Sequence, residues 1–493
     1  MPQAVAIPRD VGELAGLVQW AAAERAALVP RGAGSGMAGG NVGAGVIVDA
    51  SRTFTDLQVD PDRRSARAGA SVTWAAIAEA ARSYGLRLPA DPSSGAFATS
   101  GGMCATNAAG PRSLRYGSVR SWIDAVEVVT ADGQVRTVKR GAGSTEQFTL
   151  TPDTRRLIAR TFPHTRKNSS GYALDRFAES GDELDLLIGS EGTLGIFTAV
   201  HWRLDPIPAG IAGAVLGFTE LDALGDAVPY LVSLEPAALE LVDRTLLDLM
   251  PGTPFPGLAC LLLVEFERAT TAAARGAVGD GVRGLKHVTA HVETAVDRAG
   301  LEHLWAVRRM ASPALARLPA TRRSLQVIED GCVPLSRLGE YVTGVRRAAA
   351  RFGVPVAVFG HAGDGHVHVN ALPDTTAPRW REVLTGLFDD VTDLVARLGG
   401  VPAGEHGAGR LRAGALARVY GEETTAVFAA VKRAYDPLSI LNPGIIIPAA
   451  DWTPLAAPKV GAEAAAIPDD VATRLREIER TAAWATPKLD LAH

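Results

Sequence analysis

The chain lacks several features that mark particular protein classes. Its 493 residues include only three cysteines, Cys104, Cys260 and Cys332, which lie far apart. An odd number of widely spaced cysteines argues against a disulfide framework and against an iron–sulfur cluster held by this chain alone. No run of about eighteen uncharged apolar residues is present, so no transmembrane helix is expected. The N-terminus has no basic start followed by a long apolar run, so we expect no signal peptide and a cytoplasmic location.

Positive charge is not in excess either. The 50 lysines and arginines are balanced by 54 aspartates and glutamates, and the net charge at pH 7 is −4. Because a nucleic-acid-binding surface requires a basic patch, we expect no nucleic-acid partner. Hydrophobic residues make up 47% of the chain and charged residues 21%, which is typical of a soluble globular protein. The length predicts roughly two or three domains, because one core rarely extends over so many residues.

Two glycine-rich segments late in the chain gather side chains suited to chemistry. They are residues 358–370 and 404–407, and together they hold four of the ten histidines and a glutamate. Glycine lets the backbone turn sharply and approach a ligand closely. Imidazole and carboxylate groups are what a divalent metal or a proton-transfer step requires. The two segments therefore predict a metal site or an acid–base site.

The spacing within the first segment predicts a strand. Residues 366–370 alternate so that His366, His368 and Asn370 share one face. His361 precedes this strand across a glycine turn. From spacing alone, the metal-binding pair is either His366 with His368 or His361 with His368.

Three further glycine-rich segments lie in the first two hundred residues, at 31–40, 100–110 and 187–196. Residues 34–39 match the G-x-G-x-x-G pattern of a dinucleotide site, but a strand-like run follows at 45–49 where that site needs a helix. Successive backbone N–H groups in a glycine-rich turn still bind phosphate. The alternative is a mobile surface loop for the first segment and an ordinary turn for each of the other two. The three together predict one extended ligand that carries phosphate.

The expected elements mix helices and strands. Helices are predicted at 10–26, where Asp10 caps the first turn, and from Ser71 to Tyr84. The Asp132-Gly133 turn between two apolar runs predicts a hairpin. After Pro448, proline and alanine dominate until a last helix starts near Asp469, with Val471, Leu475, Ile478 and Ala482 on one stripe. We interpret this tail as a linker and a docking helix.

Seven motifs occur in the order of one known family. They are residues 30–40, 100–110, 114–118, 188–196, 360–368, 404–410 and 441–444. On these motifs the chain resembles the FAD-linked oxidases of the vanillyl-alcohol-oxidase/PCMH superfamily. Within that superfamily it is similar to the D-2-hydroxyacid dehydrogenase branch, which acts on D-lactate, D-2-hydroxyglutarate or glycolate. The resemblance covers residues 4–448.

The resemblance implies an α+β fold. Residues 1–206 would form a PCMH-type FAD-binding domain of two subdomains. Residues 207–448 would form an α+β cap domain that has an antiparallel sheet and binds the substrate. Residues 449–493 would be the linker and C-terminal helix.

The resemblance also implies which residues bind FAD. The loop at 30–40 would hold the pyrophosphate, and residues 91–118 would follow the ribityl and flavin portions. Residues 191–196 would support the adenine side and the flavin ring, and Asn442 would lie near the isoalloxazine. The loop offers Ser35 and Met37 where covalent members have a histidine or cysteine, so dissociable FAD is expected. The implied cofactor residues are Pro30, Arg31, Gly32, Ala33, Gly34, Ser35, Gly36, Gly39, Asp91, Ser94, Gly101, Gly102, Thr106, Asn107, Gly110, Gly117, Ser118, Glu191, Gly192, Gly195, Ile196 and Asn442.

The family's metal ligands fall on His361, His368 and Glu405 in this chain, with zinc the favoured ion. His406 would be the catalytic base, and His361 and His406 would contact the substrate. Arg308, in a W-x-x-R motif, would pair with the substrate carboxylate. His366 stands where relatives usually have asparagine, which leaves it open as a polar contact or an additional ligand.

The predicted function is oxidation of a D-2-hydroxyacid, with electrons passed to a quinone, a flavoprotein or an iron–sulfur subunit. The 2-hydroxyglutarate enzymes have lysine where Ile328 stands, so a monocarboxylate such as lactate or glycolate is favoured. Arg322 or Arg323 is an alternative anchor for a second carboxylate. A homodimer and peripheral association with the inner membrane are also compatible with the resemblance.

Three other functions stay open. An alkyl-dihydroxyacetone-phosphate-synthase-like transferase would use FAD without net oxidation. A flavin-free metal hydrolase could be built on the same histidines and glutamate. A non-catalytic subunit could bind FAD structurally.

Overall fold

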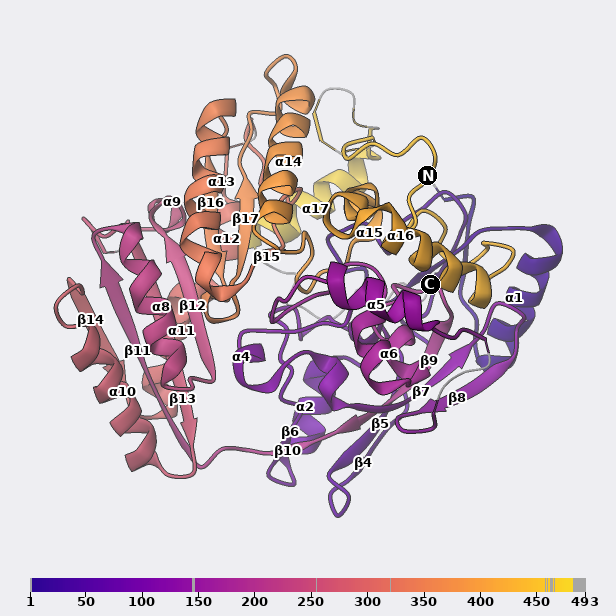
Figure 1. The fold of residues 1–493 in the computed structure, drawn as a ribbon, viewed down its shortest axis with the longest axis horizontal. Coiled ribbons are helices and arrows are strands. Elements are labelled where there is room, and N and C mark those ends of the chain that lie inside the picture. The colour runs from indigo at the N-terminus through magenta and orange to yellow at the C-terminus, as the bar shows by residue number, and fades with distance from the viewer. Residues whose placement is uncertain are drawn as a thin grey trace.

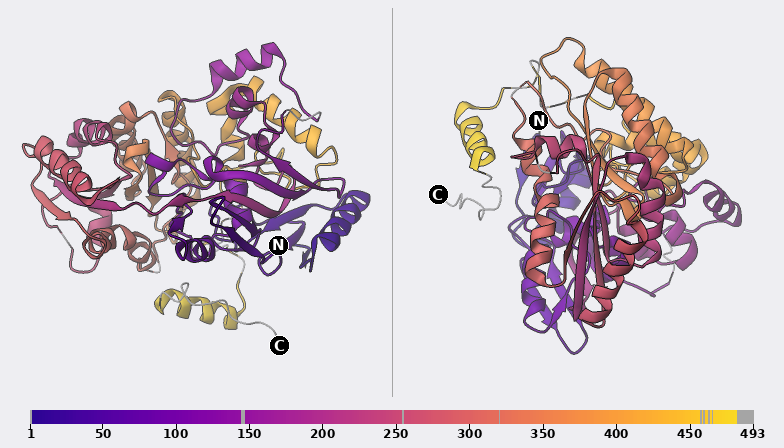
Figure 2. Two further views of the ribbon diagram at one scale, coloured as in Figure 1. Left: turned by 90° about the horizontal axis from the view of Figure 1, so that it is seen from below. Right: turned by 90° about the vertical axis from the view of Figure 1, so that its left-hand side faces the viewer.

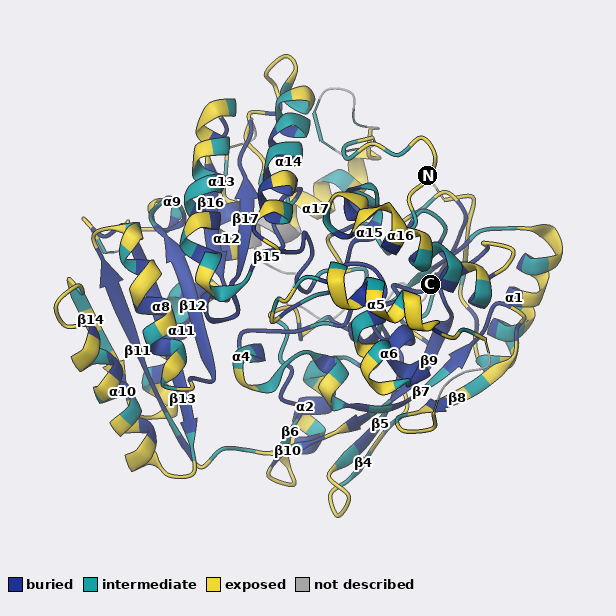
Figure 3. Cartoon of the chain, in the orientation of Figure 1, coloured by how far each residue is buried: buried dark blue, intermediate teal, exposed yellow. Residues whose placement is uncertain are grey.

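The computed structural model describes residues 2–143, 147–253, 255–319, 321–456, 458, 460–461, 464 and 466–481, with side chains up to residue 477. Two large sheets lie on opposite sides of the molecule, and helices cover them (Figure 1). The N-terminal residues build the sheets of one half, and residues 210–371 build the sheet of the other half. Strands are mostly buried, and the outer faces of the long helices are exposed (Figure 3).

The chain begins with a three-stranded parallel sheet in the order β1-β3-β2. Its elements are β1 (Ala4–Ala6), α1 (Val11–Glu24), β2 (Leu28–Arg31) and β3 (Val46–Asp49). The helix starts where the sequence predicts, because the Asp10 carboxylate accepts a 2.8 Å hydrogen bond from Glu13 N. Strands β2 and β3 are parallel neighbours, so the chain must cross back between them. The glycine-rich loop at 32–45 makes that crossing, and it therefore lies outside the sheet.

A five-stranded antiparallel sheet follows, in the order β4-β5-β9-β7-β8. The predicted hairpin is confirmed, since β7 pairs with β8 up to Val129 opposite Val135. Helix α2 starts later than expected: Thr73, not Ser71, accepts the capping hydrogen bond, while the Ser71 hydroxyl donates to Phe54 O. The elements of this region are β4 (Leu57–Asp60), β5 (Ser65–Gly69), α2 (Trp74–Arg82), β6 (Leu86–Arg87), α3 (Ser100–Thr106), α4 (Ser113–Tyr116), η1 (Val119–Trp122), β7 (Ile123–Val129), β8 (Val135–Lys139), α5 (Pro152–Thr161), α6 (Leu174–Ser180), α7 (Glu183–Leu187), β9 (Ile196–Arg203) and β10 (Asp205–Pro206).

The other half is built on a seven-stranded sheet in the order β14-β11-β13-β12-β16-β17-β15, and every pairing in it is antiparallel. This confirms the antiparallel cap sheet. Its elements are β11 (Gly210–Phe218), η2 (Leu221–Ala223), α8 (Leu224–Ser233), β12 (Ala238–Asp243), α9 (Arg244–Leu249), β13 (Cys260–Arg268), α10 (Thr271–Leu285), β14 (His291–Ala295), α11 (Arg298–Arg309), α12 (Ala311–Ala316), β15 (Gly331–Cys332), η3 (Leu335–Arg337), α13 (Leu338–Phe352), β16 (Val356–Gly360), η4 (Ala362–Asp364), β17 (His366–Ala371) and α14 (Trp380–Arg397).

Both faces of this cap sheet are buried. Along β13, Leu262 and Val264 face a core shared with α8, α10, α13 and α14, whereas Leu261 and Leu263 face a core shared with α9, α11 and α12. This is the two-residue alternation of a strand. It explains why β13 reads as an almost continuous apolar run rather than an alternating one.

The chain then returns to the N-terminal half. The elements are α15 (Gly409–Arg412), η5 (Ala413–Ala415) and α16 (Leu416–Tyr435), and residues such as Tyr420 and Phe428 belong to the core of that half. The glycine-rich loop at 404–407 therefore lies where the chain passes from the cap back to the N-terminal half. The domain boundaries at 206 and 448 stay predictions.

The tail ends in α17 (Asp469–Thr481), which stands apart from the body in Figure 2. Val471 and Leu475 are 41% and 45% exposed, so the start of the predicted stripe faces outward. The Ile478 side chain and Ala482 lie outside the described residues. None of the described helices is long and apolar enough to cross a bilayer.

Candidate active site

A cavity of about 700 Å³ lies between the two halves. The N-terminal half lines it with the glycine-rich loop at 30–41 and with residues from the segments 92–109 and 191–197. The cap lines it with Arg308, Ser312 and Asn370, and with the catalytic candidates His368, Glu405 and His406. The predicted phosphate loops and the predicted reactive cluster therefore face one common space.

Most of the predicted FAD residues line this cavity. Glycine-rich turns of this kind suit an extended phosphate-bearing ligand, because successive backbone N–H groups can form an anion-binding concavity. The lining members are Pro30, Arg31, Gly32, Ala33, Gly34, Ser35, Gly36, Ser94, Gly101, Gly102, Thr106, Glu191, Gly192, Gly195 and Ile196.

The other predicted FAD residues do not line the cavity. The Asn442 amide donates to Gly40 O and to Glu191 O, at 2.8 and 2.7 Å, and so ties two glycine loops together. The Ser118 hydroxyl donates to Asn107 Oδ1 at 2.7 Å. The members that do not line the cavity are Gly39, Asp91, Asn107, Gly110, Gly117, Ser118 and Asn442.

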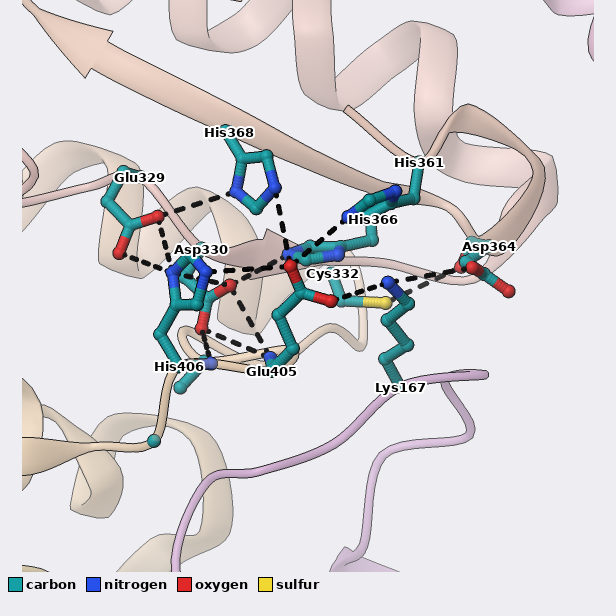
Figure 4. Close-up of polar contacts among 12 residues, drawn as sticks. Lys167, Glu329, Asp330, Cys332, His361, Asp364, His366, His368, Glu405 and His406 are labelled. Atoms are coloured by element: carbon teal, nitrogen blue, oxygen red, sulfur yellow. Dashed lines mark hydrogen bonds and ion pairs between the residues drawn. The ribbon is translucent and has the colours of Figure 1, made fainter. Parts of the chain in front are cut away.

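Four predicted residues converge in the cap. Glu405 Oε1 lies 3.1 Å from His361 Nε2, 3.4 Å from His368 Nε2 and 3.5 Å from His406 Nε2 (Figure 4). His361 and His368 are 2% and 7% exposed, and Glu405 is 8% exposed. Three imidazole nitrogens around one buried carboxylate oxygen form a compact donor set.

The hairpin of β16 and β17 brings the histidines together. Its turn passes through η4 to Gly365, which has a left-handed φ of 70°. A Cβ on this glycine would lie 2.2 Å from Val333 O, so only glycine fits there. The predicted face of β17 is confirmed in part: His368 and Asn370 line the cavity, and His366 lies deeper.

Asp330 shapes the loop that presents Glu405 and His406. Its carboxylate accepts hydrogen bonds from Glu405 N at 3.2 Å and from His406 N at 2.8 Å. It also contacts His366 Nε2 at 2.8 Å. Burial lowers the pKa of His366 to about 3, so this ring is neutral. These contacts favour the polar-contact interpretation of His366.

The predicted ligands fit a divalent cation by chemistry and orientation. The Nδ1 of His361 lies 2.6 Å from Glu240 Oε1, which leaves Nε2 as the donor atom directed at Glu405. Buried imidazole and carboxylate donors together suit zinc. Histidine and acidic residues here form two groups, and within each group the donor atoms lie within 4.8 Å of one another. The predicted ligand His368 falls in one group, and His361 and Glu405 fall in the other. One group is Glu329, Asp330, His368 and His406, and the other is His361, His366 and Glu405.

The ring of His406 is oriented by a buried carboxylate. Its Nδ1 lies 2.9 Å from both oxygens of Glu329, and Arg412 holds the same carboxylate at 2.7 Å. The Nε2 atom of His406 lies 3.5 Å from Glu405 Oε1, and His406 lines the cavity. Burial lowers the pKa of His406, but Asp330 and Glu329 outweigh burial and raise the pKa to about 10. A cation beside Glu405 would oppose that increase by repelling the imidazolium.

Arg308 lines the cavity as predicted, from the end of α11. Its Nε donates to Glu240 Oε2 at 2.7 Å, and within the described part of the chain this is its only hydrogen bond. Its terminal nitrogens are therefore available to a ligand. The carboxylate of Glu240 also contacts His361. Glu240 therefore orients both Arg308, the predicted anchor for the substrate, and His361, a predicted metal ligand.

Arg322 and Arg323 also line the cavity. Ile328 does not: it is 6% exposed and belongs to the cap core. The position where 2-hydroxyglutarate enzymes have lysine is therefore directed into the core here.

Several site residues escaped the sequence interpretation: Lys167, Glu240, Glu329, Asp330 and Arg412. A signal existed for Glu240, since it interrupts the apolar run of β12 and a buried charge needs a partner. Glu329 and Asp330 form an acidic pair next to apolar residues. The sequence offers no comparable signal for Lys167.

Buried ion pairs join the two halves beside Arg308. The Arg112 guanidinium contacts Glu265 of β13 at 2.7 and 3.0 Å, and it also pairs with Asp91. The Trp305 indole N–H donates to the same glutamate at 2.7 Å. Trp305 lies one turn before Arg308 on α11, so this network orients the helix that carries the predicted substrate anchor.

We expect Arg112→Met to lower the free energy of unfolding by about 3 kcal/mol, because it leaves buried carboxylates without their cation. The KM for substrate should also rise, since Glu265, which accepts the Trp305 hydrogen bond, is no longer fixed by Arg112. Urea denaturation and steady-state kinetics measure the two effects. Arg82→Met is the control: Arg82 is 63% exposed in a surface pair, so its loss should change stability by less than about 1 kcal/mol. An Arg112 variant as stable as this control would contradict the prediction.

Comparison with known proteins agrees with this geometry. Residues 2–139 match the family description "FAD binding domain", and residues 207–446 match "FAD linked oxidases, C-terminal domain". The chain is 30% identical to glycolate oxidase subunit GlcD of Bacillus subtilis, over 90% of this chain and 88% of that protein. It is 30% identical to a D-lactate dehydrogenase of Archaeoglobus fulgidus, over 89% and 90%. It is 28% identical to D-2-hydroxyglutarate dehydrogenase of Escherichia coli, over 91% and 48%.

A solved structure of alkyldihydroxyacetonephosphate synthase shares the fold. It superposes with a TM-score of 0.63 at 17% identity, over 89% of this chain and 76% of that one. The expected α+β fold and the resemblance are thus confirmed. The chain belongs to the FAD-linked oxidases of the vanillyl-alcohol-oxidase/PCMH superfamily, as a flavoprotein oxidoreductase of the branch that includes the D-lactate, D-2-hydroxyglutarate and glycolate enzymes.

Proposed function

We propose that this flavoprotein oxidises a D-2-hydroxyacid to the 2-oxoacid, with a divalent cation at His361, His368 and Glu405. The observation that supports it most is the shared cavity, in which the glycine loops face His368, Glu405 and His406. A cofactor bound along those loops would meet a substrate bound at the cluster. The electrons would pass to a quinone, a flavoprotein or an iron–sulfur subunit.

The chain's own residues would act as follows. Arg308 would bind the substrate carboxylate through its two free terminal nitrogens, a geometry suited to a planar carboxylate. Glu405, His361 and His368 would hold the cation beside the C2 hydroxyl, which lowers the pKa of that hydroxyl. His406 would take the hydroxyl proton at Nε2, while Glu329 keeps Nδ1 hydrogen-bonded and the ring in place. FAD, when bound, supplies the acceptor for the hydride from C2.

Non-covalent FAD is supported by the lining of the glycine loop. Residues 30–41 offer Ser35 and Met37 but no histidine or cysteine to form a tether. Their N–H groups would hold the pyrophosphate. The assignment of each loop to a part of FAD remains part of this proposal.

A small monocarboxylate such as lactate or glycolate is the preferred substrate, because Ile328 offers no second positive charge. D-2-Hydroxyglutarate is the second candidate, favoured by one observation: Arg322 and Arg323 line the same cavity as Arg308.

An anaerobic panel of hydroxyacids tests the proposal. The purified protein should show a flavin spectrum that D-lactate, D-2-hydroxyglutarate or glycolate bleaches and L-lactate does not. Absence of flavin would favour the metal hydrolase. Flavin that no hydroxyacid reduces would favour the transferase or a non-catalytic subunit.

A further inference from the structure

Lys167 reaches the catalytic cluster from the opposite half of the molecule. It lies between α5 and α6 of the N-terminal half, yet its Nζ is 2.8 Å from Glu405 Oε2 and 3.7 Å from Asp364 Oδ2 (Figure 4). The side chain is only 3% exposed. A buried lysine between two carboxylates of another domain is fixed in place by charge and hydrogen bonding.

The backbone around Lys167 is attached to the same loop. Ser169 N donates to Ala403 O at 2.9 Å, and Ser170 exchanges hydrogen bonds with both backbone groups of Ala403 at 3.0 Å. Ala403 lies two residues before Glu405. Lys167 and Glu405 are therefore joined by backbone contacts as well as by their side chains, although they belong to different halves of the chain.

The contact with Lys167 gives the two Glu405 oxygens different partners. Oε2 is occupied by Lys167, while Oε1 faces the imidazoles of His361, His368 and His406. A carboxylate can bind a cation through one oxygen or through both. With Oε2 held by an ammonium group, Glu405 offers one oxygen, which keeps a coordination position for the substrate.

We propose that Lys167 is a positioning residue that restricts Glu405 to one-oxygen binding and weakens the affinity of the site for its cation. The inference rests on the proposed cation site. The lysine lowers affinity because its own positive charge lies a few ångströms from the cation, and such repulsion is strong in a buried site. In exchange, the substrate hydroxyl gains access to the cation.

Zinc titration of FAD-loaded, chelator-treated protein by calorimetry tests this inference. We expect Lys167→Met to bind Zn²⁺ on the order of tenfold more tightly than the wild type, because repulsion is lost and Oε2 is freed. Flavin reduction at saturating hydroxyacid should become slower at the same time. Lys167→Arg, which keeps the charge, should restore both values toward those of the wild type.

Two further variants keep the test decisive. Lys167→Gln removes the charge but keeps a hydrogen-bond donor, and should also tighten binding if Lys167→Met fails to fold. Lys432→Met is the matched control: Lys432 is a buried lysine that binds Asp436 and donates to Thr193 O at 2.8 Å, outside the cluster. Its loss should leave the zinc affinity unchanged.

The zinc affinity and the rate of flavin reduction together decide whether Lys167 has this role. Tighter zinc binding with slower flavin reduction supports it. Unchanged or weaker zinc binding in both neutral variants overturns it and indicates a purely structural lysine. A wild type that binds no zinc overturns the cation site and the role of Lys167 together, whereas the hydroxyacid panel tests the oxidation reaction separately.

Discussion

His406→Ala should reduce the rate of flavin reduction by hydroxyacid about a thousandfold, because the variant lacks the proposed base. FAD binding should be unchanged, since the glycine loops that line the cofactor part of the cavity come from the other half of the chain. The ring is held at Nδ1 by Glu329 and faces Glu405 through Nε2, so its removal leaves no equivalent proton acceptor at that position. Anaerobic stopped-flow measurement of the flavin absorbance gives the rate.

His303→Ala provides the control, because that histidine is 77% exposed and pairs with Glu293 at the surface. Its rate should equal that of the wild type. If His406→Ala reduces flavin as fast as this control, His406 is not the base. If it loses FAD as well, the loop at 404–407 supports the cofactor site rather than the chemistry.

Glu405→Gln should weaken binding of a divalent cation on the order of a hundredfold, because the amide brings no negative charge to the three imidazoles. Burial raises the pKa of the Glu405 carboxyl, but Lys167 and His361 outweigh burial and hold the pKa well below its usual range. The wild-type carboxylate is therefore charged at neutral pH and available as a ligand. Activity should fall with cation content in the variant and in the chelator-treated wild type, as measured by elemental analysis and flavin reduction.

The control for this substitution is Glu79→Gln, since Glu79 is 75% exposed in a surface pair. It should keep wild-type cation content and rate. Added Zn²⁺ should restore the chelator-treated wild type but not Glu405→Gln at the same concentration. Full activity in metal-free wild type would show that the ligand assignment is wrong.

Local signals in the sequence identified much of the fold. The Asp10 cap, the Asp132-Gly133 hairpin and the antiparallel cap sheet are confirmed, because each depends on contacts within a short stretch or on the family's motif order. The prediction that Ser71 caps α2 is wrong by two residues, because the Ser71 hydroxyl donates to Phe54 O and Thr73 caps the helix. Such long-range competition for a short polar side chain leaves no trace in the local pattern.

The sequence alone also determined which side chains could form the reactive cluster, because His361, His366, His368, Glu405 and His406 lie in two glycine-rich segments. The family resemblance, and not the spacing, selects His361, His368 and Glu405 among them as the predicted ligands. Only the tertiary structure decided how they are held. Glu240 reaches His361 across 121 residues, and Lys167 reaches Glu405 across 238. Periodicity reports which face of an element a residue occupies, but not which distant element packs against that face. Buried charges find their partners only when distant elements pack together, within the cap for Glu240 and between the two halves for Lys167. The different contacts of the two Glu405 oxygens follow from that packing.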